Sequence, residues 1–117
     1  MPSVFTTFAS SRFVDRQAVV EALRRCAERL RAEEEGVVAV HLFGSFADGT
    51  ATPRSDADVV IEVADDTPAF RERIWEKGAV LFLEAPVPVD LFVISSERMA
   101  QGRGVAGAVA RQGVRLA

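Results

Sequence analysis

Three short apolar runs are the feature that most constrains what this chain can fold into. The runs are Val37–Phe43, Ala57–Val63 and Val87–Ile94, and each follows a Gly, Asp or Pro residue. Runs of this length, rich in Val, Leu, Ile and Phe, are typical of β-strands buried in a sheet. They therefore predict a core sheet that contains these three segments.

A long amphipathic helix is expected before the first strand. It runs from Arg16 to about Glu34, with Asp15 as its N-cap and Gly36 as its C-terminal stop. Apolar residues recur every three or four positions, which is the spacing of one helix face. These positions are Val19, Leu23, Cys26 and Leu30.

Further helices are expected between and after the later strands. One covers residues 68–84, and two shorter ones cover about 97–101 and 105–111, before a possible edge strand at 113–116. The order of helices and strands predicts an α/β or α+β fold, with a small mixed sheet flanked by helices.

The size and composition indicate one soluble domain over residues 1–117, with residues 1–11 as a flexible lead-in. A net charge of −3 shows no basic footprint, so no direct nucleic-acid partner is expected. Cys26 is the only cysteine, which excludes an intrachain disulfide and favours a cytoplasmic location. We expect no membrane segment, because no apolar stretch is long enough to span a bilayer.

A glycine and a serine directly follow the first predicted strand. Gly44 has no Cβ, so the backbone there can approach a phosphate group closely. The Ser45 hydroxyl and neighbouring N–H groups can donate hydrogen bonds to phosphate oxygens. A lone Gly-Ser pair is more often an ordinary turn, so its significance depends on the acidic residues downstream.

Three acidic residues lie at the start of the second predicted strand or within the third. Asp56 and Asp58 are two residues apart, so in a strand both would point to one face. Asp90 is the only charged residue in the third run, where an unpaired carboxylate would be costly. If the two strands are neighbours, the three acids predict a site for two Mg²⁺ ions, or Mn²⁺.

The loop and the acids together resemble the nucleotidyltransferase superfamily related to DNA polymerase β. Its signature is Gly-Ser, ten residues and Asp-x-Asp, and here the gap is Phe46–Ser55. Within that superfamily, the chain is most similar to the minimal nucleotidyltransferase (MNT) domain. The resemblance implies an enzyme, an antitoxin that transfers AMP from ATP to a tyrosine of a HEPN-domain ribonuclease toxin.

The resemblance also implies a role for each site residue. Gly44 and Ser45 would bind the triphosphate, and Asp56, Asp58 and Asp90 would be the catalytic and metal-binding acids. Family members commonly carry Arg or Lys where this chain has Asp48. Arg54 is the expected compensating cation and a phosphate-binding residue.

Two alternatives stay open at this point. One is nucleotidyl transfer to a small molecule, which would need a further substrate-binding region. The other is a catalytically weak or inactive binding module that neutralises its partner sterically. The base preference, the number of AMP units and the oligomeric state do not follow from the sequence.

Four other residues have simpler expected roles. His41 is expected in the core or at a strand edge, on the same strand face as Val37, Ala39 and Phe43. Trp75 and Phe82 are seven residues apart in a predicted helix and are expected in the core. Glu62 shares the Asp58 face and is a possible outer-shell group of the metal site.

Overall fold

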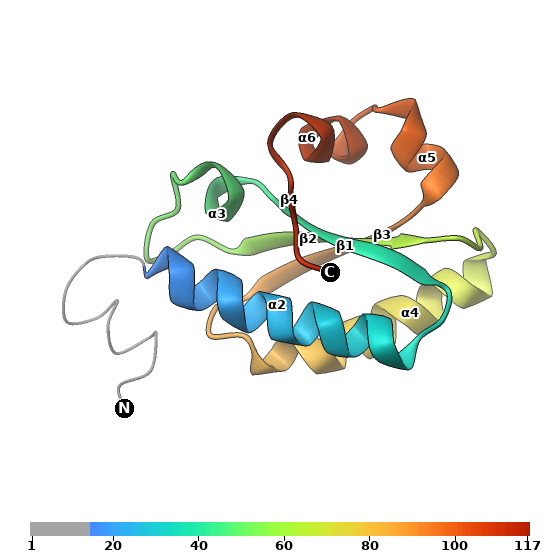
Figure 1. Cartoon of the computed structure of the whole chain (residues 1–117), viewed down its shortest axis with the longest axis horizontal. Helices are drawn as coiled ribbons and strands as arrows, with labels where there is room; N and C mark the ends of the chain where they lie inside the picture. The colour runs from blue at the N-terminus through green and yellow to red at the C-terminus, as the bar shows by residue number, and fades with distance from the viewer. Residues whose placement is uncertain (1–14) are drawn as a thin grey trace.

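The computed structural model describes residues 15–117, so the expected lead-in at residues 1–11 lies outside the described part. The elements form a four-stranded mixed sheet with helices on both sides (Figure 1). In chain order they are α2 (Arg16–Glu33), β1 (Val37–Phe43), α3 (Ser45–Asp48), β2 (Ala57–Val63), α4 (Pro68–Leu81), the 3₁₀ helix η1 (Phe82–Glu84), β3 (Val89–Ser95), α5 (Ser96–Gln101), α6 (Val105–Gln112) and β4 (Val114–Arg115).

The strands lie in the order β3-β2-β1-β4. β1 pairs antiparallel with β2 on one side and with β4 on the other. β2 and β3 are parallel, so the chain must cross over between them, and α4 makes that connection. The mixed sheet flanked by helices confirms the predicted fold class.

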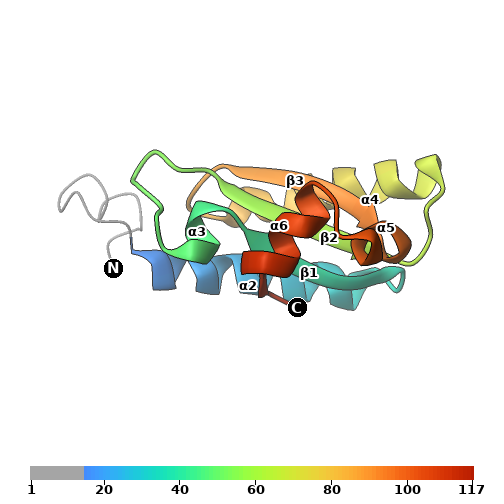
Figure 2. The same ribbon diagram turned by 90° about the horizontal axis from the view of Figure 1, so that it is seen from above.

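The two sides of the sheet are covered differently. Figures 1 and 2 show α2 and α4 together on one side, with α3, α5 and α6 on the other. Alternate residues of β2, among them Val59 and Ile61, are fully buried. They form one core with the apolar side of α2, where Leu23 and Leu30 are also fully buried. The other side, which we call the site face, carries Asp58.

α2 follows the expected pattern at its start and along its stripe. The Asp15 carboxylate accepts a hydrogen bond of 3.1 Å from the Ala18 N–H, which satisfies one free donor of the first turn. All four predicted stripe residues are buried. The helix ends at Glu33 with Glu34 as C-cap, so Gly36 does not terminate it.

An irregularity in β1 separates two residues that were expected on one face. The pairing register shifts between Val37 and Ala39. The extra residue turns the strand, so Val37 joins the α2 side while His41 faces the other side. The shared face predicted for Val37 and His41 was therefore wrong.

The second long helix is shorter than predicted and more exposed on one side. α4 ends at Leu81 and tightens into η1, and β3 begins at Val89 because Pro86 and Pro88 cannot donate to a ladder. Phe82 is buried as predicted. Trp75 is 47% exposed, and its indole N–H donates to the Leu91 carbonyl, so its predicted core position was wrong.

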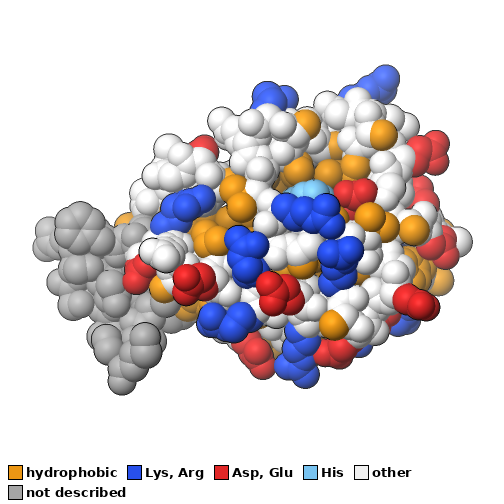
Figure 3. Space-filling model, in the orientation of Figure 1, with side chains coloured by type: hydrophobic (Ala, Val, Ile, Leu, Met, Phe, Trp, Pro, Cys, Tyr) orange, Lys and Arg blue, Asp and Glu red, His pale blue; other side chains and the backbone are white. Residues whose placement is uncertain are grey.

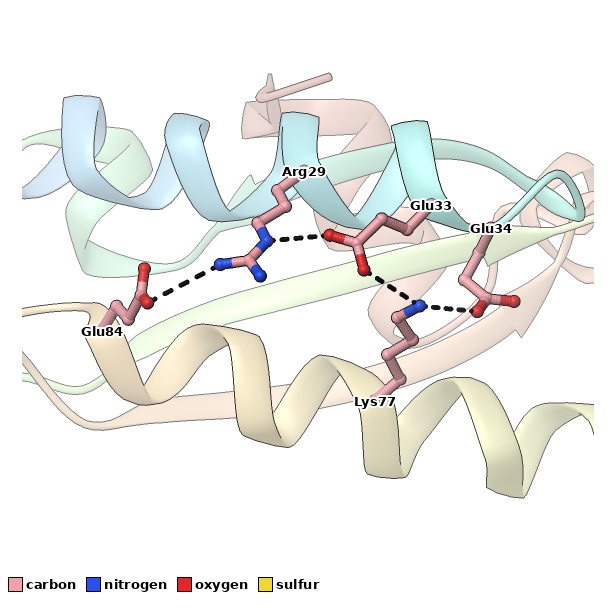
Figure 4. A network of polar contacts seen from close by, with 5 residues as sticks. All are labelled: Arg29, Glu33, Glu34, Lys77 and Glu84. Carbon is pink, nitrogen blue, oxygen red and sulfur yellow. Dashed lines mark hydrogen bonds and ion pairs between the residues drawn. The ribbon is translucent and has the colours of Figure 1, made fainter.

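A chain of ion pairs ties α2 to α4 (Figure 4). Lys77 lies between the carboxylates of Glu33 and Glu34, at 3.2 Å and 3.0 Å. Arg29 pairs with Glu33 at 2.8 Å and approaches Glu84 at 3.7 Å. Glu34 is buried, so its negative charge depends on the nearby ammonium group of Lys77. None of the helices in residues 15–117 is long and apolar enough to cross a membrane.

Candidate functional site

Asp58 and Asp90 are brought together by the parallel pairing of β2 and β3. They are direct partners in the strand register, which runs from Ala57 opposite Val89 onwards. Both lie at the start of their strands and on the same side of the sheet. The strand of Asp90 and the strand of Asp58 are therefore neighbours, which is the condition on which the predicted metal site depended.

Asp56 lies just outside the strand. β2 begins at Ala57, so the alternation that would place Asp56 and Asp58 on one face does not apply to Asp56. The Asp56 side chain is exposed in the loop before β2. Its charge is nevertheless close enough to Asp58 to affect the ionisation of that residue.

The environment of Asp58 disfavours its negative charge. Burial raises the pKa of Asp58, and the nearby charges of Asp90 and Asp56 raise it further. A divalent cation between Asp58 and Asp90 would relieve this repulsion, and carboxylate oxygens are the ligands that Mg²⁺ prefers. The pair of carboxylates therefore fits a magnesium ion.

The predicted three-acid set is not assembled in advance. Among residues 15–117, no group of three His, Cys, Asp or Glu side chains is arranged to hold a metal ion. Mg²⁺ commonly binds through one or two carboxylates, with water and substrate phosphates as its other ligands. Two facing aspartates are sufficient for that mode of binding.

The Gly44–Ser45 loop lies directly against Asp58. Gly44 has φ +76° and ψ −154°, a combination that is open almost only to glycine. A Cβ at this position would collide with the Oδ2 atom of Asp58. The missing side chain of Gly44 thus lets the loop and the carboxylate share one small space.

α3 is held by a dense set of backbone hydrogen bonds. The Gly44 carbonyl accepts from the N–H groups of Ala47 and Asp48, both at 3.0 Å. The Ser45 carbonyl accepts from three N–H groups at 3.0–3.1 Å, which are those of Gly49, Thr50 and Ala51. Phe46 is fully buried and anchors the turn in the core. This short helix is therefore held both by backbone hydrogen bonds and by the burial of Phe46.

The acidic residue in this loop is engaged locally. Asp48 is exposed, and its carboxylate accepts hydrogen bonds from the backbone N–H and the hydroxyl of Thr50. Those bonds lower the pKa of Asp48. The Asp48 carboxylate therefore stabilises the turn that follows α3.

Arg54 lies in the exposed turn before β2. Its backbone N–H donates to the Thr52 hydroxyl. Its guanidinium makes no hydrogen bond or ion pair with any residue from 15 to 117. The predicted role of Arg54 in phosphate binding therefore stays a prediction.

A second polar cluster lies further along the site face. His41 Nε2 is 3.0 Å from one oxygen of Glu62, and the Ser96 hydroxyl donates to the other oxygen at 2.7 Å. Although burial opposes it, these hydrogen bonds lower the pKa of Glu62. Glu62 thus lies on the face predicted for an outer-shell group, but its carboxylate is committed to His41 and Ser96.

Two phenylalanines lie close to the aspartates on this face. Phe43 and Phe92 have ring centroids 5.7 Å apart, and Phe92 is 37% exposed. Phe92 follows Asp90 by two residues, so strand alternation alone would have placed it on the same face. Ser96 could not have been found from the sequence, because its partner Glu62 is far away along the chain.

The sequence of this chain matches one known family. The sequence profile of the nucleotidyltransferase domain matches residues 23–105, which include the loop and all three acids. No curated protein sequence matches the chain.

Several solved structures share the fold. A protein from Sulfolobus solfataricus assigned as a nucleotidyltransferase has a TM-score of 0.60 and 14% identity, and the match covers 86% of this chain and 80% of that one. A toxin–antitoxin structure with AMP-PNP has a TM-score of 0.53 and 24% identity, with 80% and 72% covered. A mutant of the toxin–antitoxin complex MntA-HpeT has a TM-score of 0.52 and 20% identity, again with 80% and 72% covered.

Proposed function

Because the chain belongs to the nucleotidyltransferase domain family, we propose that it is a Mg²⁺-dependent adenylyltransferase of the MNT antitoxin type. Its substrate is ATP, and its acceptor is a tyrosine hydroxyl on a HEPN-domain toxin. The observation that carries the proposal is the direct pairing of Asp58 with Asp90 beside the Gly44 backbone.

The proposed reaction needs few protein groups. The acceptor hydroxyl oxygen forms a bond to the α-phosphorus of ATP, and the bond from that phosphorus to the bridging oxygen breaks. Pyrophosphate leaves with the electron pair, and the hydroxyl proton passes to the Asp90 carboxylate and then to water. Such transfers depend mainly on positioning and on neutralising charge.

Each part of the site has a place in that scheme. Asp58 and Asp90 would hold the metal, and Asp56 in the adjoining loop would add a nearby negative charge. The bound Mg²⁺ supplies charge neutralisation at the triphosphate. The Ser45 hydroxyl and the N–H groups at the start of α3 would hold phosphate oxygens, and Gly44 lets this loop lie directly against Asp58.

The toxin partner is supported by the fold comparison and by the open site. Two structures with this fold are toxin–antitoxin complexes, one of them with AMP-PNP. Asp90 is exposed at the start of edge strand β3, so an acceptor presented by another protein can reach it. A cytoplasmic location follows from this proposal.

The decisive experiment uses the chain together with a HEPN-domain toxin, the partner proposed here. With ATP and Mg²⁺, mass spectrometry of that protein should show the mass of added AMP. Asp58→Asn should lower the transfer rate about a hundredfold or more, because a charge-stabilising group is lost from the reacting centre. Glu76→Gln, an exposed acid on α4, is the matched control and should leave the rate unchanged.

The same variants separate catalysis from steric blocking. If Asp58→Asn still forms the complex but no longer silences the toxin, AMP transfer is the mechanism. If the wild-type chain silences the toxin with no AMP adduct, the protein is a binding module and the proposal is wrong.

Magnesium binding can be tested without the partner. Mg²⁺ should raise the melting temperature of the wild-type chain, since a ligand that binds the native state stabilises it. Asp58→Asn should abolish that rise, whereas Glu76→Gln should preserve it. An equal Mg²⁺ response in all three proteins would place the ion elsewhere.

A further inference from the structure

We infer that Arg16 is a positioning residue for the nucleotide loop, an inference that rests on the proposed function. Arg16 is the first residue of α2, and α3 lies 30 residues later in the sequence. Both ribbon views place α3 beside the start of α2 (Figures 1 and 2). The Arg16 guanidinium donates from Nε to the Phe46 carbonyl at 2.6 Å and from Nη2 to the Ala47 carbonyl at 3.3 Å.

These two bonds give hydrogen-bond partners to two carbonyls near the C-terminal end of a very short helix. The last carbonyls of any helix have no partner within it. In α3 the carbonyls of Gly44 and Ser45 are used by backbone N–H groups. The next two, those of Phe46 and Ala47, are the ones that Arg16 takes. The four successive carbonyls from Gly44 to Ala47 thus all accept hydrogen bonds, which supports a four-residue turn that would not be stable alone.

The charge of Arg16 suits α3 better than its own helix. A cation at the first position of α2 lies at the positive end of that helix dipole, which is unfavourable. The same cation lies at the negative end of α3, which is favourable. The positive charge of Arg16 therefore stabilises the turn that carries Ser45.

Rigid placement of this turn matters for the proposed chemistry. The Ser45 hydroxyl and the first N–H groups of α3 must point at the triphosphate when ATP arrives. Arg16 holds the opposite end of the turn, so it fixes the direction of α3 without touching the nucleotide. It also brings a positive charge to a turn that carries the exposed carboxylate of Asp48.

The test compares three variants with the wild-type chain. Arg16→Gln removes the clamp, and Arg16→Lys keeps the charge but cannot span two carbonyls in the same way. Arg24→Gln is the matched control, because Arg24 lies on the same helix and donates to the carbonyls of Arg115 and Leu116 at 3.3 Å and 3.4 Å, away from α3. The measurements are amide hydrogen exchange at residues 47–51, the Kd of an ATP analogue that is not hydrolysed, and kcat and KM for ATP.

Arg16→Gln should speed exchange at residues 47–51 and raise both the Kd and the KM about tenfold or more, while kcat changes little. That size is expected for the loss of charge-assisted hydrogen bonds. Arg16→Lys should be intermediate, and it carries the test if Arg16→Gln does not fold. Arg24→Gln should leave the loop exchange and the KM as in the wild type.

The inference is overturned if Arg16→Gln keeps the wild-type exchange rates and nucleotide affinity, or if Arg24→Gln loses as much. Failure of the proposed function looks different. In that case the wild-type chain itself neither binds the ATP analogue nor transfers AMP, and hydrogen exchange still reports whether Arg16 clamps α3.

Discussion

A side chain at position 44 would occupy the space of the Asp58 carboxylate. At the scale of single residues, position 44 is constrained both by its backbone conformation and by the neighbouring carboxylate. Gly44 combines a φ of +76° with a carboxylate oxygen directly over its Cα. By contrast, Gly102 also has a positive φ, of 66°, but nothing lies within 4 Å of a Cβ built there. A substitution at Gly102 would therefore cause backbone strain alone, whereas one at Gly44 would cause backbone strain and a collision with Asp58.

We expect Gly44→Ala to lower the free energy of unfolding by about 2–3 kcal/mol, since its backbone region is nearly closed to other residues. It should also abolish the stabilisation by Mg²⁺, because Asp58 must move. Gly102→Ala should cost about 1 kcal/mol and keep the Mg²⁺ response. Urea unfolding with and without Mg²⁺ measures both effects. If Mg²⁺ stabilised Gly44→Ala as much as the wild type, Asp58 would not be a ligand of the metal.

At the scale of elements, α2 and α4 are joined by charge as well as by apolar packing. Glu34 is buried at the end of α2 and accepts hydrogen bonds from Lys77 and Arg73 of α4, at 3.0 Å and 2.8 Å. The bond from Lys77 is the main reason that the pKa of Glu34 is lowered, with Arg73 adding to it. Glu33 shares Lys77, and its pKa is lowered by Arg29 and Lys77. The crossover helix is thus held to α2 by ionised glutamates.

This contact predicts a particular loss of stability in acid. Glutamate in the unfolded chain has its ordinary pKa of 4.5, above the lowered value in the folded state. The unfolded state therefore takes up protons first, and the stabilisation is present above about pH 5 and is lost progressively as the pH falls below it. The free energy of unfolding, measured by urea titration at several pH values, should fall in that range.

Lys77→Gln should make the acid-induced loss of stability shallower, because the pKa of Glu34 then returns toward its ordinary value. Arg31→Gln is the control, since it removes an exposed charge from α2 and should keep the wild-type slope. A slope in Lys77→Gln as steep as that of the wild type would mean that other carboxylates cause the acid sensitivity.

At the scale of the whole molecule, the end of the chain completes the sheet begun by β1. Leu116 is 1% exposed, its N–H donates to the Val40 carbonyl at 2.7 Å, and the Val40 N–H donates to the Ala117 carbonyl at 3.0 Å. Arg24 of α2 caps the carbonyls of Arg115 and Leu116 from the other side. Figure 3 shows basic side chains gathered on this face, although the net charge of the chain is −3. The Arg24 side chain thus helps to hold β4 in place.

Leu116→Ala should lower the free energy of unfolding by about 2–5 kcal/mol, because a buried leucine leaves a cavity in the core. Leu83→Ala provides the contrast, since Leu83 is 80% exposed and its loss should change stability by less than about 0.5 kcal/mol. Urea unfolding measures both. Equal effects would show that the C-terminal residues contribute little to the core.

Local signals predicted most of the secondary structure. The bounds of β1 and β2 match the apolar runs, because a buried strand must be apolar along its length. Two departures have local causes, of which only the proline can be seen in the sequence. Pro88 delays β3 to Val89, and the irregularity near Ala39 turns Val37 away from His41.

The side-chain environments were harder to predict, because they depend on distant partners. Helical spacing placed Trp75 in the core, but the sheet ends before it can cover that side of α4. Nothing near Glu34 in the sequence shows that Lys77 and Arg73 would surround it. Likewise, the bonds from Arg16 to α3 join segments 30 residues apart, a separation that no periodic pattern reports.

By itself, the sequence determined the strands, the glycine-serine turn and the three acidic residues of the candidate site, because each depends on neighbours within a few positions. Only the tertiary structure decided that Asp58 faces Asp90, that Asp56 lies outside the strand and that Arg16 reaches α3. The physical reason is that the parallel register of β2 and β3 depends on how α4 packs across the sheet, and that packing is a property of the whole core.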